Sequence, residues 1–362
     1  MKIKKKGIII IILLFISLLI HFFSINAERV ENNYSTNIYP FIAAKFRILF
    51  GWIPFSVGDI LWLVLIIFLA KQLYLFFVFL LIKKRRTITK ETAIQSMYSF
   101  LFFTTIFYIF FNVFWGINYN RQGIARQLDL QLKAYSLDEL KTINRLLVKK
   151  INESKQILVK NRTAYPSTQK LFVMTEKAYK NVENKFPFLQ YHSCSIKQSM
   201  WGWLGNYTGF LGYYNPATGE AQVNTTVPKF SQPFTACHEV AHQLGYAKEM
   251  EANFVGYLAA ASSADTVFQY SVYTDLFIYA NRTLYFADSS SAFYYRRLLL
   301  SSVLDDYKER RKFNQAHTSF VEPIFRSAYG LFLISNQQPN GILSYDEVTG
   351  FIIAYYKKFG II

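Results

Sequence analysis

Residues 238–242 read His-Glu-Val-Ala-His, and residues 249–253 read Glu-Met-Glu-Ala-Asn. Two histidines four apart on a helix project from the same face, one turn above the other, which is the geometry that two imidazoles need to bind one zinc ion. The first stretch therefore predicts a helix that carries His238 and His242 as metal ligands. Glu239 is the expected general base, because a carboxylate beside the first ligand can accept a proton from a metal-bound water.

A third ligand is needed, since a catalytic zinc site has three protein ligands and an open position for water. Gly245 stands where a helix can end in a left-handed turn, which lets the chain reverse. Glu249 then opens a second helix and is the favoured third ligand, with Glu251 as the alternate. Asn253 shares a helix face with Glu249 and is expected to hydrogen-bond a ligating histidine. The competing interpretation is a buried helix with core histidines, followed by acidic residues that stabilise a helix N-terminus.

These motifs resemble those of the gluzincin metallopeptidases, whose second motif is Glu-x-x-(Ala/Ser)-Asp, and Asn253 stands where that Asp is usual. The longer string at residues 237–254, Cys-His-Glu-Val-Ala-His-Gln-Leu-Gly-Tyr-Ala-Lys-Glu-Met-Glu-Ala-Asn-Phe, is similar to an uncharacterised bacterial membrane family, domain of unknown function 3810. The strings Ile-Pro-Phe-Ser-Val-Gly-Asp at 53–59 and Trp-Gly-Ile-Asn-Tyr at 115–119 carry the same resemblance. It implies zinc-peptidase-like character and supplies no substrate.

The composition is that of a membrane protein, with 52% hydrophobic and 18% aromatic residues. Apolar runs at about 7–23, 60–82 and 97–117 are each long enough to span or nearly span a bilayer. For the first run, a cleaved signal peptide ending near Ala27 is the alternative to an anchor. We therefore expect a membrane region at 1–117 and a second domain at 118–362.

Positively charged clusters predict the orientation of these spans. Lysines at 2 and 4–6 precede the first span, and the run 83–86, Lys-Lys-Arg-Arg, lies between the second and third. Such clusters favour the cytoplasmic side, so the sequence predicts a multi-pass protein of the cell membrane with a cytoplasmic N-terminus and an extracytoplasmic C-terminal domain. The same clusters account for part of the net charge of +17, and no base-reading motif is present, so we expect no nucleic-acid partner.

The second domain is expected to be α+β, mainly α, and zincin-like. Ser136 begins a capping box before one helix, a second helix covers about 167–184, and later helices cover about 265–287, 291–313 and 344–358. Two β-prone runs, 209–214 and 220–227, flank an Asn-Pro-Ala-Thr-Gly turn and predict a hairpin. In zincin folds such a strand pairs with extended substrate, and the candidates for that role are Gly219, Glu220, Ala221 and Gln222.

Two questions stay open at the level of sequence. A zinc peptidase needs a donor for the oxyanion, and Tyr270, Arg282, His317 and Tyr345 are all candidates. Cys194 and Cys237, the two cysteines of the chain, could form a disulfide, although a small buried filler is the favoured reading of Cys237.

The predicted function is that of a membrane-anchored, zinc-dependent metallopeptidase that cleaves an unidentified peptide or protein outside the cytoplasm. The alternative is a non-catalytic envelope protein in which zinc is a structural staple and the activity is partner binding. Glu239 distinguishes the two, because a structural zinc site does not need a general base.

Overall fold

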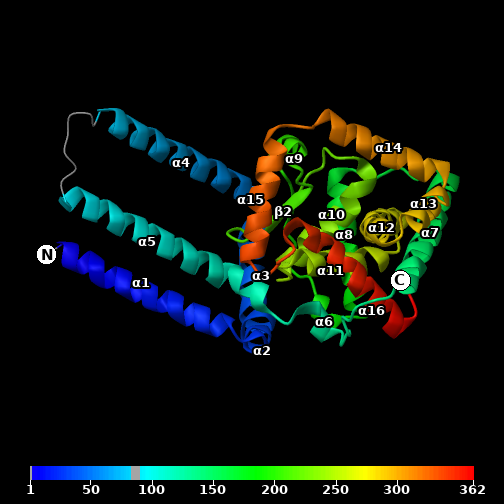
Figure 1. Cartoon of the computed structure of the whole chain (residues 1–362), viewed down its shortest axis with the longest axis horizontal. Coiled ribbons are helices and arrows are strands. Elements are labelled where there is room, and N and C mark those ends of the chain that lie inside the picture. The colour runs from blue at the N-terminus through cyan, green and yellow to red at the C-terminus, as the bar shows by residue number, and fades with distance from the viewer. Residues whose placement is uncertain (1, 83–89) are drawn as a thin grey trace.

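The computed structural model describes residues 2–82 and 90–362, and it is mainly helical. Three long helices, α1 (Lys2–Ser24), α4 (Val57–Ile82) and α5 (Lys90–Phe114), extend to one side of a helical domain (Figure 1). Each is long and apolar enough to cross a membrane. Within the apolar windows at most 11% of the residues are buried, so these surfaces are available to lipid. The basic cluster at 83–86 lies outside the described residues.

The third span ends earlier than the sequence suggested. α5 stops at Phe114, and Ile117 belongs to a short 3-10 helix, η3 (Gly116–Asn120). Gly116 sits so close to Phe111 that an added Cβ would lie 2.7 Å from its ring. The α-helix ends at Trp115, which has non-helical backbone angles with φ of −156°, and glycine at position 116 permits the close approach that follows.

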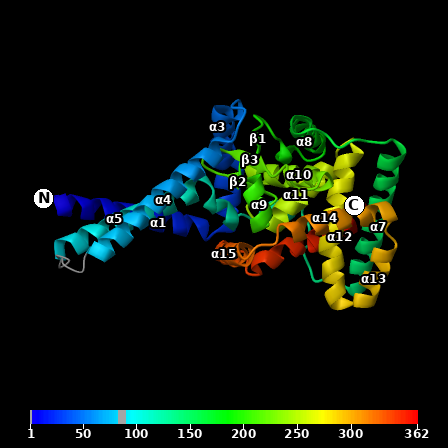
Figure 2. The ribbon, with the colours of Figure 1, turned by 90° about the horizontal axis from the view of Figure 1, so that it is seen from above.

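Residues 27–51 lie between the first two spans and pack against the domain, and we call them the collar. The sequence did not predict these helices. The collar consists of α2 (Ala27–Arg29), a π-helix η1 (Val30–Ile38) and α3 (Tyr39–Gly51). Its buried Val30, Tyr34 and Tyr39 pack with Trp115. Figure 2 shows α3 on one side of the span ends and α15 on the other.

Helices build most of the domain. They are α6 (Gly123–Gln127), α7 (Leu137–Lys160), α8 (Thr168–Glu183), α10 (Gln232–Gln243), α11 (Glu249–Ala261), α12 (Thr266–Ala287), α13 (Ser289–Arg297), α14 (Ser301–Ala316), α15 (Val321–Ser335) and α16 (Val348–Phe359). Ser136 forms the predicted capping box with Glu139. The core is one large cluster in which α10, α11 and α12 are central.

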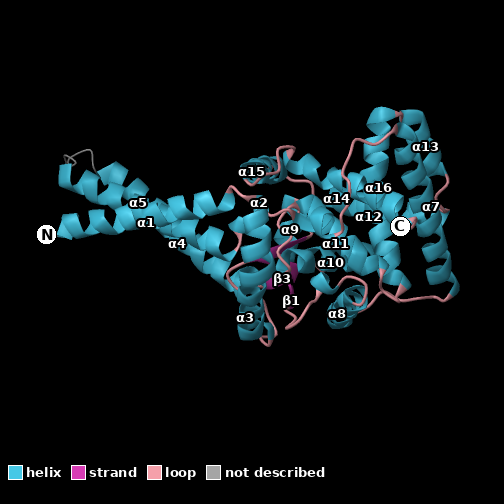
Figure 3. Ribbon diagram, turned by 90° about the horizontal axis from the view of Figure 1, so that it is seen from below, coloured by secondary structure: helices cyan, strands magenta, loops and turns pink. Residues whose placement is uncertain are grey.

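A small sheet covers α10 on one side (Figure 3). It contains β1 (Ile196–Gln198), β2 (Gly212–Asn215) and β3 (Glu220–Val223) in the order β1-β3-β2, and the short helix α9 (Gly202–Thr208) lies between β1 and β2. β2 and β3 form the predicted antiparallel hairpin, and β1 runs parallel to β3. β3 is therefore the central strand, while β2 is an edge strand.

Two of the later predictions were wrong. The segment 291–313 is not one helix, because α13 ends at Arg297 and α14 begins at Ser301. The amide of Asn152 holds this break by donating to the Leu298 carbonyl and accepting from the Leu300 N–H. The helix expected at about 344–358 begins later, at Val348, because Gly341–Glu347 is a 3-10 helix, η6, in which the Ser344 hydroxyl has no hydrogen-bond partner.

The cysteines are not joined. Both thiols are free, with Cys237 fully buried in the core and Cys194 partly exposed. Cys237 thus packs as a small apolar filler on α10.

Candidate metal centre

The local sequence around α10 and α11 sets up a tight helical reversal. Ser231 is the N-cap residue of α10, although its hydroxyl makes no capping bond. Gly245 has φ of +87°, the left-handed conformation that glycine adopts without strain, and its bare Cα faces the Tyr39 ring. α11 then begins at Glu249. This turn brings the first residue of α11 back over the last two turns of α10.

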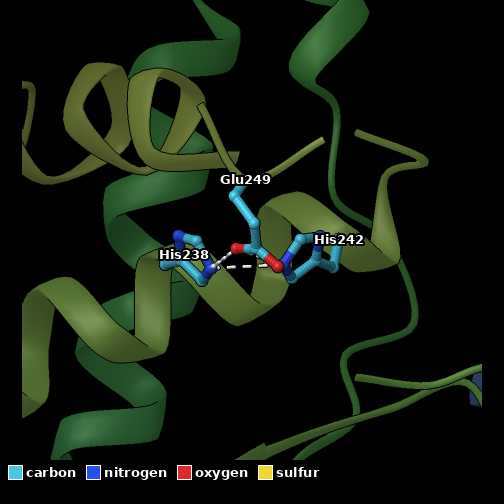
Figure 4. A group of neighbouring side chains, drawn as sticks. All are labelled: His238, His242 and Glu249. Atoms are coloured by element: carbon cyan, nitrogen blue, oxygen red, sulfur yellow. Dashed lines mark hydrogen bonds and ion pairs between the residues drawn. The ribbon is translucent and has the colours of Figure 1, made fainter. Parts of the chain in front are cut away.

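His238, His242 and Glu249 meet at one point, all three of them buried (Figure 4). The two Nε2 atoms are 3.1 Å apart. Glu249 Oε2 is 3.2 Å from Nε2 of His238 and 3.6 Å from Nε2 of His242. Among the described residues this is the group of histidine, cysteine and acidic side chains that could hold a metal ion.

These three distances fit a zinc site. In a tetrahedral zinc complex with bonds of about 2.0–2.1 Å, neighbouring ligand atoms are about 3.3 Å apart. The observed separations bracket that value, so the three atoms form one face of such a tetrahedron. Glu249 Oε2 is buried and has no hydrogen-bond partner, which is costly unless a ligand satisfies it. The donor set of two imidazoles and a carboxylate therefore fits zinc and leaves one position for water.

The second ring nitrogen of His242, Nδ1, contacts a backbone carbonyl. This atom lies 2.8 Å from the Tyr246 carbonyl, which can only accept, so Nδ1 carries a proton and Nε2 is free to bind a cation. The Trp115 ring packs edge-on against the same imidazole, with centroids 5.9 Å apart. The site is therefore one side chain away from the end of α5.

Asn253 does not play the predicted part. It is buried on α11, but its Nδ2 has no partner, and Nδ1 of His238 has none either. The expected hydrogen bond between Asn253 and a ligating histidine is thus absent from the described residues.

Glu251 lies on the other side of α11. Two residues along a helix correspond to a rotation of about 200°, so Glu249 and Glu251 point in nearly opposite directions. The Glu251 carboxylate packs directly against Gly123, whose φ is +76°. The fold therefore brings Glu249 to the histidines and keeps Glu251 away from them.

Glu239 is buried beside the cluster, and its Oε2 has no hydrogen-bond partner. Burial raises the pKa of this carboxyl to about 7, although the charges of His238 and His242 act in the opposite direction. Gly212 of β2 makes room for it, since a Cβ there would lie 2.6 Å from Glu239 Oε1. Glu239 thus lies between the three cluster residues and the edge strand of the sheet.

Two tyrosines border the cluster. The Tyr329 hydroxyl of α15 donates to Glu249 Oε1 at 2.5 Å, and the Tyr345 ring of η6 stacks on His238 with centroids 6.4 Å apart. Burial and the charge of Glu249 hold the pKa of both phenols well above the usual range. Both therefore remain neutral hydrogen-bond donors.

Of the four oxyanion candidates, Tyr345 is the one that lies against the cluster. The Tyr270 hydroxyl binds Asp306, and Arg282 forms an ion pair with Asp346. His317 packs against Phe313. These three side chains have structural partners elsewhere.

The proposed substrate strand was misplaced. Glu220, Ala221 and Gln222 belong to β3, which is hydrogen-bonded to a strand on each side, so no edge is left for an added strand. Gly219 precedes β3, and its carbonyl accepts from Gln243. Glu220 instead accepts hydrogen bonds from two backbone N–H groups at the start of α4. The strand with an edge beside Glu239 is β2.

Buried arginines tie the C-terminal end of α10 to the collar and the span ends. Arg47 of α3 donates to the Gln243 carbonyl, and Arg121, after η3, donates to the Gly245 carbonyl. Positive charges are favoured there by the helix dipole. Arg121 is in turn paired with Glu31 of η1 through two hydrogen bonds.

Sequence reasoning missed three residues of the site. Tyr329 lies on α15, a helix that carries no motif, and Trp115 stood out only as part of the string at 115–119. Gly256 was overlooked as a packing residue, although it lies seven residues after Glu249 and so shares its helix face. A Cβ on Gly256 would be 3.1 Å from the His238 backbone nitrogen, so glycine sets how closely α11 approaches α10.

Comparison with known proteins assigns the family. The family model described as "Protein of unknown function (DUF3810)" matches residues 34–353, which is most of the chain, and the protein belongs to that family. No curated protein and no solved structure matches it. The match covers the collar from residue 34 onward, the long apolar helices α4 and α5, and the whole cluster.

Proposed function

We propose that this protein is a membrane-anchored, zinc-dependent metallopeptidase with a zincin-like domain at residues 118–362. The observation that carries the proposal is the triangle of His238, His242 and Glu249, whose donor atoms have the spacing of a tetrahedral zinc site. Three protein ligands are typical of catalytic zinc, whereas structural sites use four.

In this proposal the zinc ion and the side chains have separate roles in peptide hydrolysis. A bound zinc ion would polarise the substrate carbonyl and make its water ligand acidic. His238, His242 and Glu249 would hold the ion. Glu239 would take the proton of the attacking water and pass it to the leaving amine, and its burial raises its pKa toward the value that such a shuttle needs.

Further residues would position the substrate. β2 ends its sheet, so an extended peptide can add to it, and Gly212 brings that strand against Glu239. Tyr345 would donate to the developing oxyanion, because its neutral phenol lies beside the cluster. Tyr329 would orient Glu249 through its hydroxyl.

Topology is part of the proposal. Lys90 follows the basic run 83–86 and opens α5. With these charges in the cytoplasm, the N-terminus would also be cytoplasmic and the cluster would lie outside. The peptide or protein substrate would then belong to the cell envelope.

The test is Glu239→Gln in the full chain, with Glu183→Gln as a control on α8. Envelope fractions from cells producing each form are compared for new polypeptide N-termini, and the purified proteins for zinc. We expect Glu239→Gln to keep its zinc and to lower cleavage by roughly 10²–10⁴-fold, which is typical of a lost general base. Cleavage products that persist unchanged in that variant contradict the mechanism. Zinc without any cleavage, even by the wild type, favours the structural-staple alternative.

A further inference from the structure

α15 has an apolar stripe on the face turned away from the domain. Phe320, Ile324, Leu331 and Ile334 recur at helical spacing on one side of the helix, and all four are exposed, Phe320 by 86% and Leu331 by 69%. Ser327 lies between them on the same face. The two charged residues of the helix lie elsewhere around its axis and contact each other. A stripe of this size without charge marks a surface that meets an apolar partner.

The opposite face of α15 points into the protein. Leu333 is fully buried, and the Tyr329 hydroxyl reaches Glu249. Phe332, between the two faces, packs against Phe111 with ring centroids 6.2 Å apart. Phe111 is part of the last turn of the apolar window Ile94–Phe114. This contact places α15 at the level where the third span ends.

The neighbouring elements continue the same surface. α15 packs beside α9, whose Trp203 and Leu204 are exposed by 57% and 44%. On the far side of the span ends, α3 exposes Leu49, and Trp52 directly after it is 78% exposed (Figure 2). Tryptophan is enriched where a protein crosses from lipid to water. In Figure 1, α15 runs across the direction of the three spans, as a helix lying in the plane of a membrane would.

We propose that α15 and α9 lie in the membrane interface, with the stripe of Phe320, Ile324, Leu331 and Ile334 immersed in lipid. An amphipathic helix at the depth of a span end gains from burying its apolar face at the boundary between headgroups and acyl chains. The bilayer then supports a helix whose inner face holds Tyr329 on Glu249. This surface requires neither a metal ion nor peptidase activity.

The test measures the depth of labels on the full-length chain in phosphatidylcholine vesicles. Single cysteines at Leu331→Cys and Ser327→Cys are introduced with Cys194→Ser, while the fully buried Cys237 is retained, and each is labelled with an environment-sensitive fluorophore. Phe286→Cys, an 80% exposed position at the end of α12, is the control. Lipids with a spin label high on the acyl chain serve as quenchers.

We expect quenching at both α15 positions to be several-fold greater than at the control, with a blue-shifted emission. Ser327 is small and exposed, so a cysteine there should not disturb the packing of α15. Weak quenching at this position would therefore reflect a lack of membrane contact and not misfolding. Equal, weak quenching at all three positions overturns the proposal. A blue shift without lipid quenching also overturns it, since the stripe is then covered by protein, such as a second copy of the chain.

Discussion

The junction with the spans and the metal cluster both bury carboxylates, but those of Glu31 and Glu220 at the junction are fully hydrogen-bonded, whereas those of the cluster are not. At the junction, both carboxylate oxygens of Glu31 accept hydrogen bonds, from Arg121 and from neighbours that include Gly123, and those of Glu220 are equally occupied. In the cluster, one oxygen each of Glu239 and Glu249 has no hydrogen-bond partner, and that of Glu249 has only the two histidine nitrogens within ion-pair distance. Buried polar groups in folded proteins are nearly always paired. The difference distinguishes Glu31 and Glu220, which hold the junction together, from Glu239 and Glu249, which the proposed function assigns to the metal site.

The largest effect is expected where a satisfied pair is broken. Arg121→Ala leaves Glu31 buried without its partner and removes a donor from the Gly245 carbonyl. We expect a loss of about 3–5 kcal/mol in the free energy of unfolding, because an uncompensated charge stays buried. Thermal unfolding in detergent measures it, with the exposed Arg126→Ala as control. Equal stability of the two variants would show that the junction does not depend on this pair.

A smaller effect is expected where α11 crosses α10. Gly256→Ala places a Cβ 3.1 Å from the His238 nitrogen, so the helices must separate slightly. We expect a cost of about 1–3 kcal/mol, as for other overpacked sites, together with weaker zinc binding. Gly350→Ala on α16 is the matched control, since its new Cβ would lie 3.6 Å from Tyr135, an ordinary contact. That control should stabilise the protein by about 0.5–1 kcal/mol. A Gly256→Ala variant that behaves like it would refute close helix packing as a requirement of the site.

The smallest effect concerns acid. Burial raises the pKa of Glu31, but the hydrogen bond and charge of Arg121 outweigh it, so the folded pKa lies below the usual 4.5. The stabilisation from Glu31 is therefore fully present above the unfolded pKa and is lost as the pH falls through the lowered folded pKa. Glu31→Gln should flatten this part of the pH dependence of unfolding. If the free energy of unfolding falls with decreasing pH in the same way for the variant and the wild type, Glu31 is not ionised in the folded protein.

Sequence predicted the parts of this protein that repeat a local pattern. The spans, the α10–α11 pair, the Gly245 reversal and the hairpin each follow from periodicity or turn chemistry over a few residues. Glu249, the favoured third ligand, is the one that lies beside the two histidines, because helix rotation turns Glu251 to the other face; its binding of a metal stays a prediction.

The features that could not be predicted from the sequence depend on contacts between distant segments. The collar at 27–51 and the approach of Tyr329 and Trp115 to the cluster depend on tertiary packing across many residues. The sequence did not show that residues 220–222 lie on a central strand, because β1, only three residues long, gave no sequence signal, and its pairing converts β3 from an edge into a central strand.

The measurement that tests the central claim most directly is the zinc content of the detergent-purified full chain, compared with Glu249→Gln and Glu251→Gln. The two substitutions are chemically identical and lie on the same helix. Burial raises the pKa of Glu251, so a neutral amide should be tolerated there. We predict about one zinc per chain in the wild type and in Glu251→Gln, and almost none in Glu249→Gln. A well-folded wild type that binds no zinc when it is supplied, or equal zinc in all three proteins, would contradict the account.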